Sequence, residues 1–156
     1  MTDAEVEQFL GEARDLHVAT IGPDGAPHMV TMWYGIVDGK IAFWTYGKSQ
    51  KVRNLERDPR LTVLVADGDQ YSELRGIQIQ GRARILHDPD DVGAIGEAVY
   101  SRNAPRFGDV RFEGRDFEFD DDTRAAVRAM GAKRVGIVVE PDHVVTWDHR
   151  KLGGIY

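Results

Sequence analysis

The stretch from Trp44 to Leu55 constrains this chain most, because it leads from a strand through a glycine turn into a basic helix start. The strand, residues 40–46, is aromatic and β-branched and follows an Asp-Gly hairpin signal. Ser49 is a natural N-cap for the helix. An anion there would meet free backbone N–H groups, the positive end of the helix dipole, a hydroxyl and two ammonium groups, those of Lys48 and Lys51. The stretch predicts a phosphate cradle; the alternative is a hairpin and an ordinary surface helix with solvated lysines.

The composition limits the class of protein. The 156 residues fit a single domain over 1–156, and the absence of cysteine excludes disulfides, thiolate metal sites and a cysteine nucleophile. The first residues are acidic and amphipathic, and no apolar run approaches the ~18 residues of a membrane span. The net charge of −6 disfavours binding to nucleic acid and anionic lipid. We therefore expect a cytoplasmic protein with no nucleic-acid or membrane partner.

The hydrophobic pattern predicts a mostly antiparallel sheet with helices outside it. Helices are expected over residues 2–13, 89–100 and 123–130, and from Ser49 to an end at Asp58-Pro59. Thr2 and Glu5 have capping-box spacing for the first, and Asp88 is the expected N-cap of the helix over 89–100. Strands are expected over residues 16–21, 27–37, 40–46, 60–66, 75–86, 134–139 and 143–148, with a turn at Pro141 between the last two. Residues 103–122 follow neither period and predict an irregular excursion, either a lid over a pocket or a surface insertion pinned by its phenylalanines. Six or seven short strands with frequent turns favour a small β-barrel over a βαβ sheet.

A family resemblance follows from the order of these features. A helix, a strand, a Pro-Asp-Gly turn, a strand and an Asp-Gly turn precede a spaced set of residues: Thr45, Lys51, Asn54, Leu55, Asp58, Pro59 and Arg60. This order, from Glu5 to about Leu86, resembles the pyridoxamine-phosphate-oxidase-like split β-barrel superfamily. The resemblance implies a mainly β (α+β) fold, an antiparallel split barrel of six or seven strands with peripheral helices, of the FMN-binding type.

Two further features separate branches of that superfamily. The closing run from Trp147 to Tyr156 resembles the actinobacterial deazaflavin-dependent branch, whose members bind coenzyme F420 rather than FMN. The FMN-dependent oxidases resemble one another in a basic pair in the second strand, whereas residues 30–35 here are Val-Thr-Met-Trp-Tyr-Gly. The resemblance therefore implies coenzyme F420 as the cofactor, with FMN as the alternative.

The resemblance also implies the residues that bind the cofactor. Strand residues would line the ring: Val30, Thr31, Met32, Gly76 and Ile77. The phosphodiester would be held by Thr45, Lys48, Ser49 and Lys51, with Asn54 bracing the turn. Trp147 would close the site, or else would be a core or dimer-interface tryptophan. The oligoglutamate tail would need more cations, of which Arg53, Arg57 and Arg75 are nearest in sequence. A homodimer with the site at the subunit interface is implied as well.

The implied chemistry is hydride transfer from reduced deazaflavin to an unsaturated or conjugated hydrophobic small molecule. The cofactor carries this chemistry, so no catalytic dyad is required. None is visible: the sequence has no nucleophile elbow, zinc-protease motif or P-loop, and its five histidines lack metal-ligand spacing. Tyr46, Tyr71, His149 and solvent are candidate proton donors, and none is assigned. The alternatives are an FMN-dependent oxidoreductase on the same barrel, and a non-catalytic protein that binds the cofactor or haem.

Overall fold

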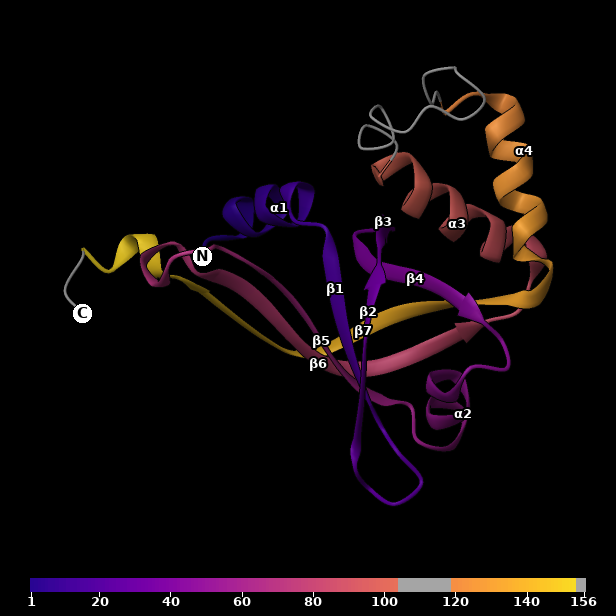
Figure 1. Cartoon of the computed structure of the whole chain (residues 1–156), viewed down its shortest axis with the longest axis horizontal. Coiled ribbons are helices and arrows are strands. Elements are labelled where there is room, and N and C mark those ends of the chain that lie inside the picture. The colour runs from indigo at the N-terminus through magenta and orange to yellow at the C-terminus, as the bar shows by residue number, and fades with distance from the viewer. Residues whose placement is uncertain (104–118, 154–156) are drawn as a thin grey trace. The chain divides into compact units, whose positions relative to one another are not determined.

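A computed structural model describes residues 1–103 and 119–153 of the chain (Figure 1). The helices are α1 (Asp3–Glu12), α2 (Gln50–Arg57), α3 (Pro89–Asn103) and α4 (Asp121–Met130), with single 3₁₀ turns η1 (Tyr71–Glu73), η3 (Gly131–Lys133) and η4 (His149–Lys151). The strands are β1 (Asp15–Ile21), β2 (Pro27–Trp33), β3 (Gly35–Val37), β4 (Lys40–Tyr46), β5 (Arg60–Asp67), β6 (Arg75–Leu86) and β7 (Arg134–Asp148). No helix among the described residues is both long and apolar enough to span a membrane.

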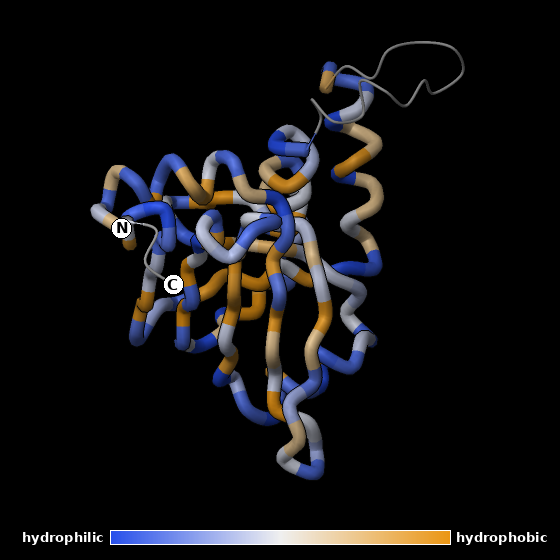
Figure 2. Tube along the Cα trace, turned by 60° about the vertical axis from the view of Figure 1, so that its left-hand side comes forward, coloured by the Kyte–Doolittle hydropathy of each residue, from blue (hydrophilic) through white to orange (hydrophobic). Residues whose placement is uncertain are grey.

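The strands are hydrogen-bonded neighbours in the order β2-β1-β5-β6-β7-β4-β3. β5 pairs antiparallel with both β1 and β6, and β4 pairs antiparallel with both β3 and β7. Hydrophobic residues recur along these strands, as Figure 2 shows. The predicted fold class, an antiparallel split-barrel sheet with peripheral helices, is confirmed. Of the predicted excursion over 103–122, residues 104–118 lie outside the described part, and residues at its two ends belong to α3 and α4.

The contacts divide the chain into two compact units. Unit 1 consists of residues 1–32, 54–82 and 140–156, and unit 2 consists of residues 33–53 and 83–139. The prediction of one domain stays a prediction.

In unit 1, α1 begins with the capping box that its sequence predicts. The Thr2 hydroxyl accepts a hydrogen bond from the Glu5 N–H (3.4 Å), and the Glu5 carboxylate accepts one from the Thr2 N–H (2.6 Å). The register pairs Val18 of β1 with Val63 of β5, so their side chains lie on the same face of the sheet. Both are buried, and this face therefore forms the core of unit 1. Phe9 of α1 is buried with them.

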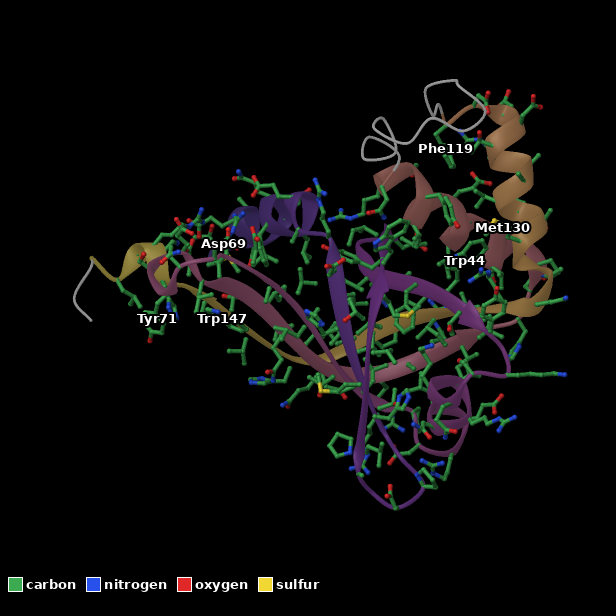
Figure 3. The ribbon with its side chains drawn as sticks, viewed as in Figure 1. Trp44, Asp69, Tyr71, Phe119, Met130 and Trp147 are labelled. Carbon is green, nitrogen blue, oxygen red and sulfur yellow. The ribbon has the colours of Figure 1, made fainter. Side chains whose placement is uncertain are left out.

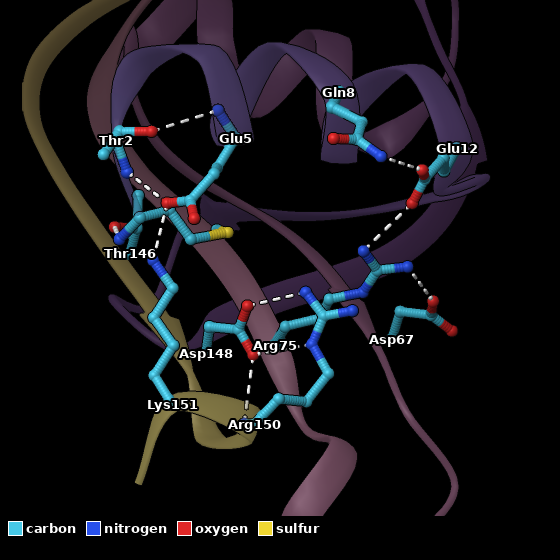
Figure 4. Close-up of polar contacts among 11 residues, drawn as sticks. Thr2, Glu5, Gln8, Glu12, Asp67, Arg75, Thr146, Asp148, Arg150 and Lys151 are labelled. Carbon is cyan, nitrogen blue, oxygen red and sulfur yellow. Dashed lines mark hydrogen bonds and ion pairs between the residues drawn. The ribbon is translucent and has the colours of Figure 1, made fainter.

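A network of ion pairs, which we call the clasp, joins α1 to β6 and to η4, the turn that follows β7, in unit 1 (Figure 4). Lys151 donates to the Glu5 carboxylate (2.6 Å), and Arg150 pairs with Asp148 (2.6 Å). Arg75 of β6 bridges two further carboxylates, those of Glu12 (2.9 Å) and Asp67 (3.0 Å). Each of these charges therefore has an opposite charge beside it.

In unit 2, the core forms around Trp44 of β4. Its ring packs against apolar residues of α3 and α4: Val92, Ile95, Val99 and Val127. A Cβ atom at Gly96 of α3 would lie 2.6 Å from this ring, so the glycine permits the close approach of helix and strand. Figure 3 shows Trp44, Phe119 and Met130 around α3 and α4.

Two predicted strand boundaries are wrong. The strand expected over 27–37 is divided at the fully buried Tyr34 into β2 and β3. Gly35 lies so close to α3 that a Cβ atom there would be 2.8 Å from Ala98, so β3 packs directly on α3 within unit 2. The strands expected over 134–139 and 143–148 are instead one strand, β7, that runs through Pro141. Gly81 of β6 makes room for it, because a Cβ atom there would meet the Glu140 carbonyl oxygen.

Candidate functional site

The turn between β4 and α2 is held by backbone hydrogen bonds within unit 2. The Gly47 N–H donates to the Lys133 carbonyl (3.1 Å), and the Ser49 N–H donates to the Tyr46 carbonyl (2.9 Å). The Ser49 carbonyl accepts from the N–H groups of Val52 (3.1 Å) and Arg53 (3.2 Å). Ser49 therefore occupies the predicted N-cap position, since its carbonyl accepts the first hydrogen bonds of α2.

The Ser49 hydroxyl does not cap the helix. Its Oγ atom is buried and has no hydrogen-bond partner among the described residues. A buried hydroxyl without a partner costs free energy, so native structures usually satisfy such a group. An oxygen of a bound anion would satisfy it.

Lys51 reaches back to the end of β4. Its Nζ donates to the Thr45 hydroxyl (2.9 Å), and Thr45 is itself buried. Burial lowers the pKa of Lys51, since it disfavours the charged form. In the described part of the chain, neither Lys51 nor the exposed Lys48 forms an ion pair. The structure thus brings Thr45, Lys48, Ser49 and Lys51 to one strand end, with two cations and a hydroxyl left for a ligand.

Asn54 belongs to unit 1 and braces α2 against β1. It is fully buried, and its Nδ2 donates to the Thr20 hydroxyl (3.0 Å). Arg57 donates to the Ile21 carbonyl and, more weakly, to Asn54 Oδ1 (3.4 Å). Asn54 therefore holds α2 on strand β1, and its predicted role, bracing the turn, stays a prediction.

The residues predicted to line a ring all lie in unit 1. Val30, Thr31 and Met32 belong to β2, where Thr31 is exposed and its hydroxyl lies 3.1 Å from His17 Nδ1. Gly76 and Ile77 are buried in β6. Trp147 lies on Gly76, where a Cβ atom would be 2.3 Å from the indole ring. The structure therefore brings Gly76 and Trp147 together and gives Trp147 a packing role in its own subunit.

The candidate proton donors Tyr71 and His149 also meet in unit 1. His149 Nδ1 lies 2.9 Å from the Tyr71 carbonyl, and the two ring centroids are 4.8 Å apart. Figure 3 places Tyr71 near Trp147. Tyr46, the third candidate, is exposed at the end of β4 in unit 2. Among the described residues, no three histidine, aspartate or glutamate side chains gather as a metal site.

Unit 1 also contains a cavity of about 460 Å³ between strands β1, β5, β6 and β7. Its walls include Ala19, Ile21, Thr62, Gln80 and His143. None of the residues predicted to bind a cofactor lines it, so it adds no support to those predictions.

The basic residues that sequence proximity suggested for a tail are not equivalent. Arg75 is committed to the clasp, and Arg57 is bound to the backbone of β1. Arg53 is exposed and forms no ion pair among the described residues. The sequence analysis missed Lys133, whose carbonyl anchors Gly47, because no local pattern reveals a partner so distant along the chain.

Comparisons with known proteins agree with the fold. The sequence matches the family model for pyridoxamine 5'-phosphate oxidase over residues 2–148. The conserved hypothetical protein Rv2991 from Mycobacterium tuberculosis is 39% identical, with a TM-score of 0.85, covering 100% of this chain and 90% of that one. A protein named F420 Reductase is 28% identical, with a TM-score of 0.62, covering 89% of this chain and 94% of that one.

HutZ from Vibrio cholerae, described as a haem storage protein, is 13% identical with a TM-score of 0.64, covering 94% of this chain and 93% of that one. At this identity the likeness shows the fold alone. No curated protein matches the sequence. The family match spans nearly the whole chain and confirms the predicted superfamily: the chain belongs to the pyridoxamine 5'-phosphate oxidase family.

Proposed function

We propose that this chain is an F420-dependent oxidoreductase that transfers a hydride from the reduced deazaflavin to an unsaturated or conjugated hydrophobic small molecule. The observation that carries the proposal is the end of β4, where a buried hydroxyl and two lysines face no carboxylate among the described residues. The oxygens of a phosphodiester would accept hydrogen bonds from these groups. The 28% identity to a protein named F420 Reductase supports the same cofactor.

The second strand favours a deazaflavin over FMN. β2 contains no lysine or arginine between Pro27 and Trp33, whereas the FMN-dependent oxidases that the chain resembles carry a basic pair there. β2 instead offers the backbone groups of Val30, Thr31 and Met32 to a ring. When bound, the cofactor would supply the hydride, and the chain would supply binding, orientation and exclusion of water.

The proposal includes the assembly and its place in the cell. We expect a cytoplasmic homodimer with the site at the subunit interface and a small molecule as substrate. Exposed apolar side chains such as Met29 and Val144 in unit 1 are consistent with a surface that another subunit covers. Light scattering tests the oligomeric state, and a monomer would contradict the expected homodimer.

A fluorescence titration of the purified protein with coenzyme F420 and, in parallel, with FMN tests the cofactor. We expect tight binding of F420 and at least tenfold weaker binding of FMN. Lys51→Ala should weaken F420 binding about 5- to 140-fold, because a charge-assisted hydrogen bond to phosphate is worth about 1–3 kcal/mol. Lys40→Ala, at the other end of β4, is the control and should leave the affinity unchanged.

The other outcomes separate the alternatives. Tighter binding of FMN would favour an FMN-dependent oxidoreductase. If neither flavin binds and added haem gives a Soret band, the non-catalytic haem-binding alternative replaces the proposal. Unchanged F420 affinity in a folded Lys51→Ala variant would show that the end of β4 is not a phosphate-binding site.

A further inference from the structure

Arg134, the first residue of β7, is stacked on two aromatic rings in unit 2. Its Cζ atom lies 4.6 Å from the centroid of the Trp44 ring and 4.5 Å from that of Tyr46. The register pairs Tyr46 with Arg134, which places these three side chains on one face of the β4–β7 ladder. The rings hold the guanidinium in place but do not neutralise it.

The charge of Arg134 has no counter-ion among the described residues. It forms no ion pair there, and its Nε atom is buried without a hydrogen-bond partner. Glu97, a carboxylate of the neighbouring α3, is bound by Arg124 and Arg128 instead. Arginine stays charged at every physiological pH, so Arg134 is a permanent cation with unused donors.

The backbone places Arg134 beside the turn that follows β4. Lys133 accepts the hydrogen bond of the Gly47 N–H, so Lys48 and Lys133 leave the backbone at the same strand end. Both side chains are exposed, and neither forms an ion pair in the part of the chain that the structure describes. We call Lys48, Lys51, Lys133 and Arg134 the cationic cluster.

The cluster occupies two faces of β4. Lys51 bonds to Thr45, whereas Arg134 stacks on Trp44 and Tyr46, whose side chains point to the opposite face. A single phosphodiester cannot contact both sides. A flexible ligand with further anionic groups can do so by passing over the turn at Gly47 and Lys48.

We infer that Lys133 and Arg134 bind the carboxylates of an anionic tail that continues from the phosphodiester held at Ser49 and Lys51. This inference rests on the proposed function, and it names the part of the chain that receives the oligoglutamate extension of coenzyme F420. It replaces Arg57 and Arg75 as tail ligands, because both are engaged elsewhere in unit 1. FMN, which ends in its phosphate, would leave Arg134 unused.

The test compares two forms of the cofactor in a fluorescence titration: coenzyme F420 with several glutamates, and its phospholactate form with none. Arg134→Gln should weaken binding of the glutamylated form about tenfold, since it removes a charge-assisted contact. It should change the affinity for the glutamate-free form by less than about twofold. Lys51→Ala should weaken both forms equally. Lys40→Gln, about 20 Å away along β4, removes the same charge and should change neither.

Two further variants keep the test decisive if Arg134→Gln is unstable in a thermal scan. Arg134→Lys keeps the charge and should restore most of the affinity for the glutamylated form. Lys133→Gln should weaken binding of that form about threefold, because an exposed and mobile lysine contributes less.

Each remaining outcome would overturn the inference. Equal weakening of both forms by Arg134→Gln would mean that Arg134 only supports the phosphate cradle. Unchanged affinity for both forms would mean that no tail contacts it. If the wild-type protein binds neither form, the proposed function itself fails, and the inference fails with it.

Discussion

The clasp in unit 1 and the cationic cluster in unit 2 use charged side chains in opposite ways. In the clasp, Lys151 meets Glu5, Arg150 meets Asp148, and Arg75 lies between two carboxylates. In the cationic cluster, neither Lys51 nor Arg134 forms an ion pair with any described residue. Charges that are already paired hold the chain together, whereas unpaired charges are available to a ligand. Substitutions in the first region should therefore change stability, and substitutions in the second should change binding.

Gly76→Val should have the largest effect on stability. It tests how much the region of the clasp depends on apolar packing as well as on its ion pairs. A Cβ atom at Gly76 would lie 2.3 Å from the Trp147 ring, so the larger side chain must push the end of β7 away from β6. We expect the free energy of unfolding to fall by about 3 kcal/mol in urea titrations. Gly11→Ala is the control, because no atom lies within 4 Å of a Cβ atom there, and it should be neutral or slightly stabilising. Wild-type stability of Gly76→Val would show that Trp147 does not pack on β6.

Thr2→Ala tests whether the clasp region depends on its helix cap. The substitution removes the hydroxyl that accepts the Glu5 N–H at the start of α1. The free energy of unfolding should fall by about 1 kcal/mol, the usual cost of losing a threonine N-cap. Thr2→Ser keeps the hydroxyl and should restore most of the loss. If serine and alanine prove equally destabilising at this position, the hydroxyl is not what holds the helix start.

The pH dependence of stability tests the ion pairs of the clasp, with a smaller expected effect than the two substitutions above. Hydrogen bonds from Lys151 and from the Thr2 N–H lower the pKa of Glu5 to about 2, and Arg150 lowers the pKa of Asp148 to about 2. Both values lie below the ordinary carboxyl range, so the stability that these groups add is full above about pH 5 and is lost as the pH falls towards 2.

Thermal scans of Glu5→Gln against the wild type should therefore show a lower Tm at pH 7 and a difference that closes as the pH falls. The effect is modest, because the side chains of Glu5 and Lys151 are 40% and 49% exposed and salt screens their pairing. A difference in Tm that is the same at neutral and at acid pH would mean that the charge of Glu5 contributes nothing.

Ser49→Ala should have the smallest effect on stability. It tests directly whether the Ser49 hydroxyl binds a ligand or caps a helix. Its hydroxyl occupies the same position in α2 as that of Thr2 in α1, but it has no partner among the described residues. We expect the free energy of unfolding to stay within about 0.5 kcal/mol of wild type, while F420 affinity falls roughly three- to tenfold. A loss of stability as large as that of Thr2→Ala would show that the hydroxyl caps α2, and the contrast between the two helix starts would disappear.

Local sequence signals predicted the parts of the fold that local interactions determine. The Thr2 and Glu5 capping box begins α1, and Asp88 begins α3 by accepting from the Asp90 N–H (2.9 Å). The cradle residues were predicted in the same way, because Thr45 to Asn54 are neighbours in sequence. Their roles in binding stay predictions.

Contacts between residues far apart in the sequence determined the features that the sequence analysis did not predict. β3 begins at Gly35, which packs on Ala98 of α3, and β7 runs through Pro141 where Gly81 leaves room for it. Arg134 joins the cationic cluster only because β7 pairs with β4. Pro141 was interpreted as part of a turn, and Arg134 was overlooked as a ligand-binding residue, for the same reason. In each case the residue that determines its position, Gly81 or Tyr46, lies far away in the sequence.

The composition of the two units has a consequence for synthesis on the ribosome. Unit 2 contains no residue beyond Val139, so all its strands have been made before β7 is complete. Unit 1 joins Glu5 to Lys151, which is 146 residues later. Its first helix therefore emerges long before its last partner, and the surface of β6 at Gly76 stays uncovered until Trp147 has been translated. Unit 1 therefore cannot complete these contacts until the end of β7 and η4 have been translated.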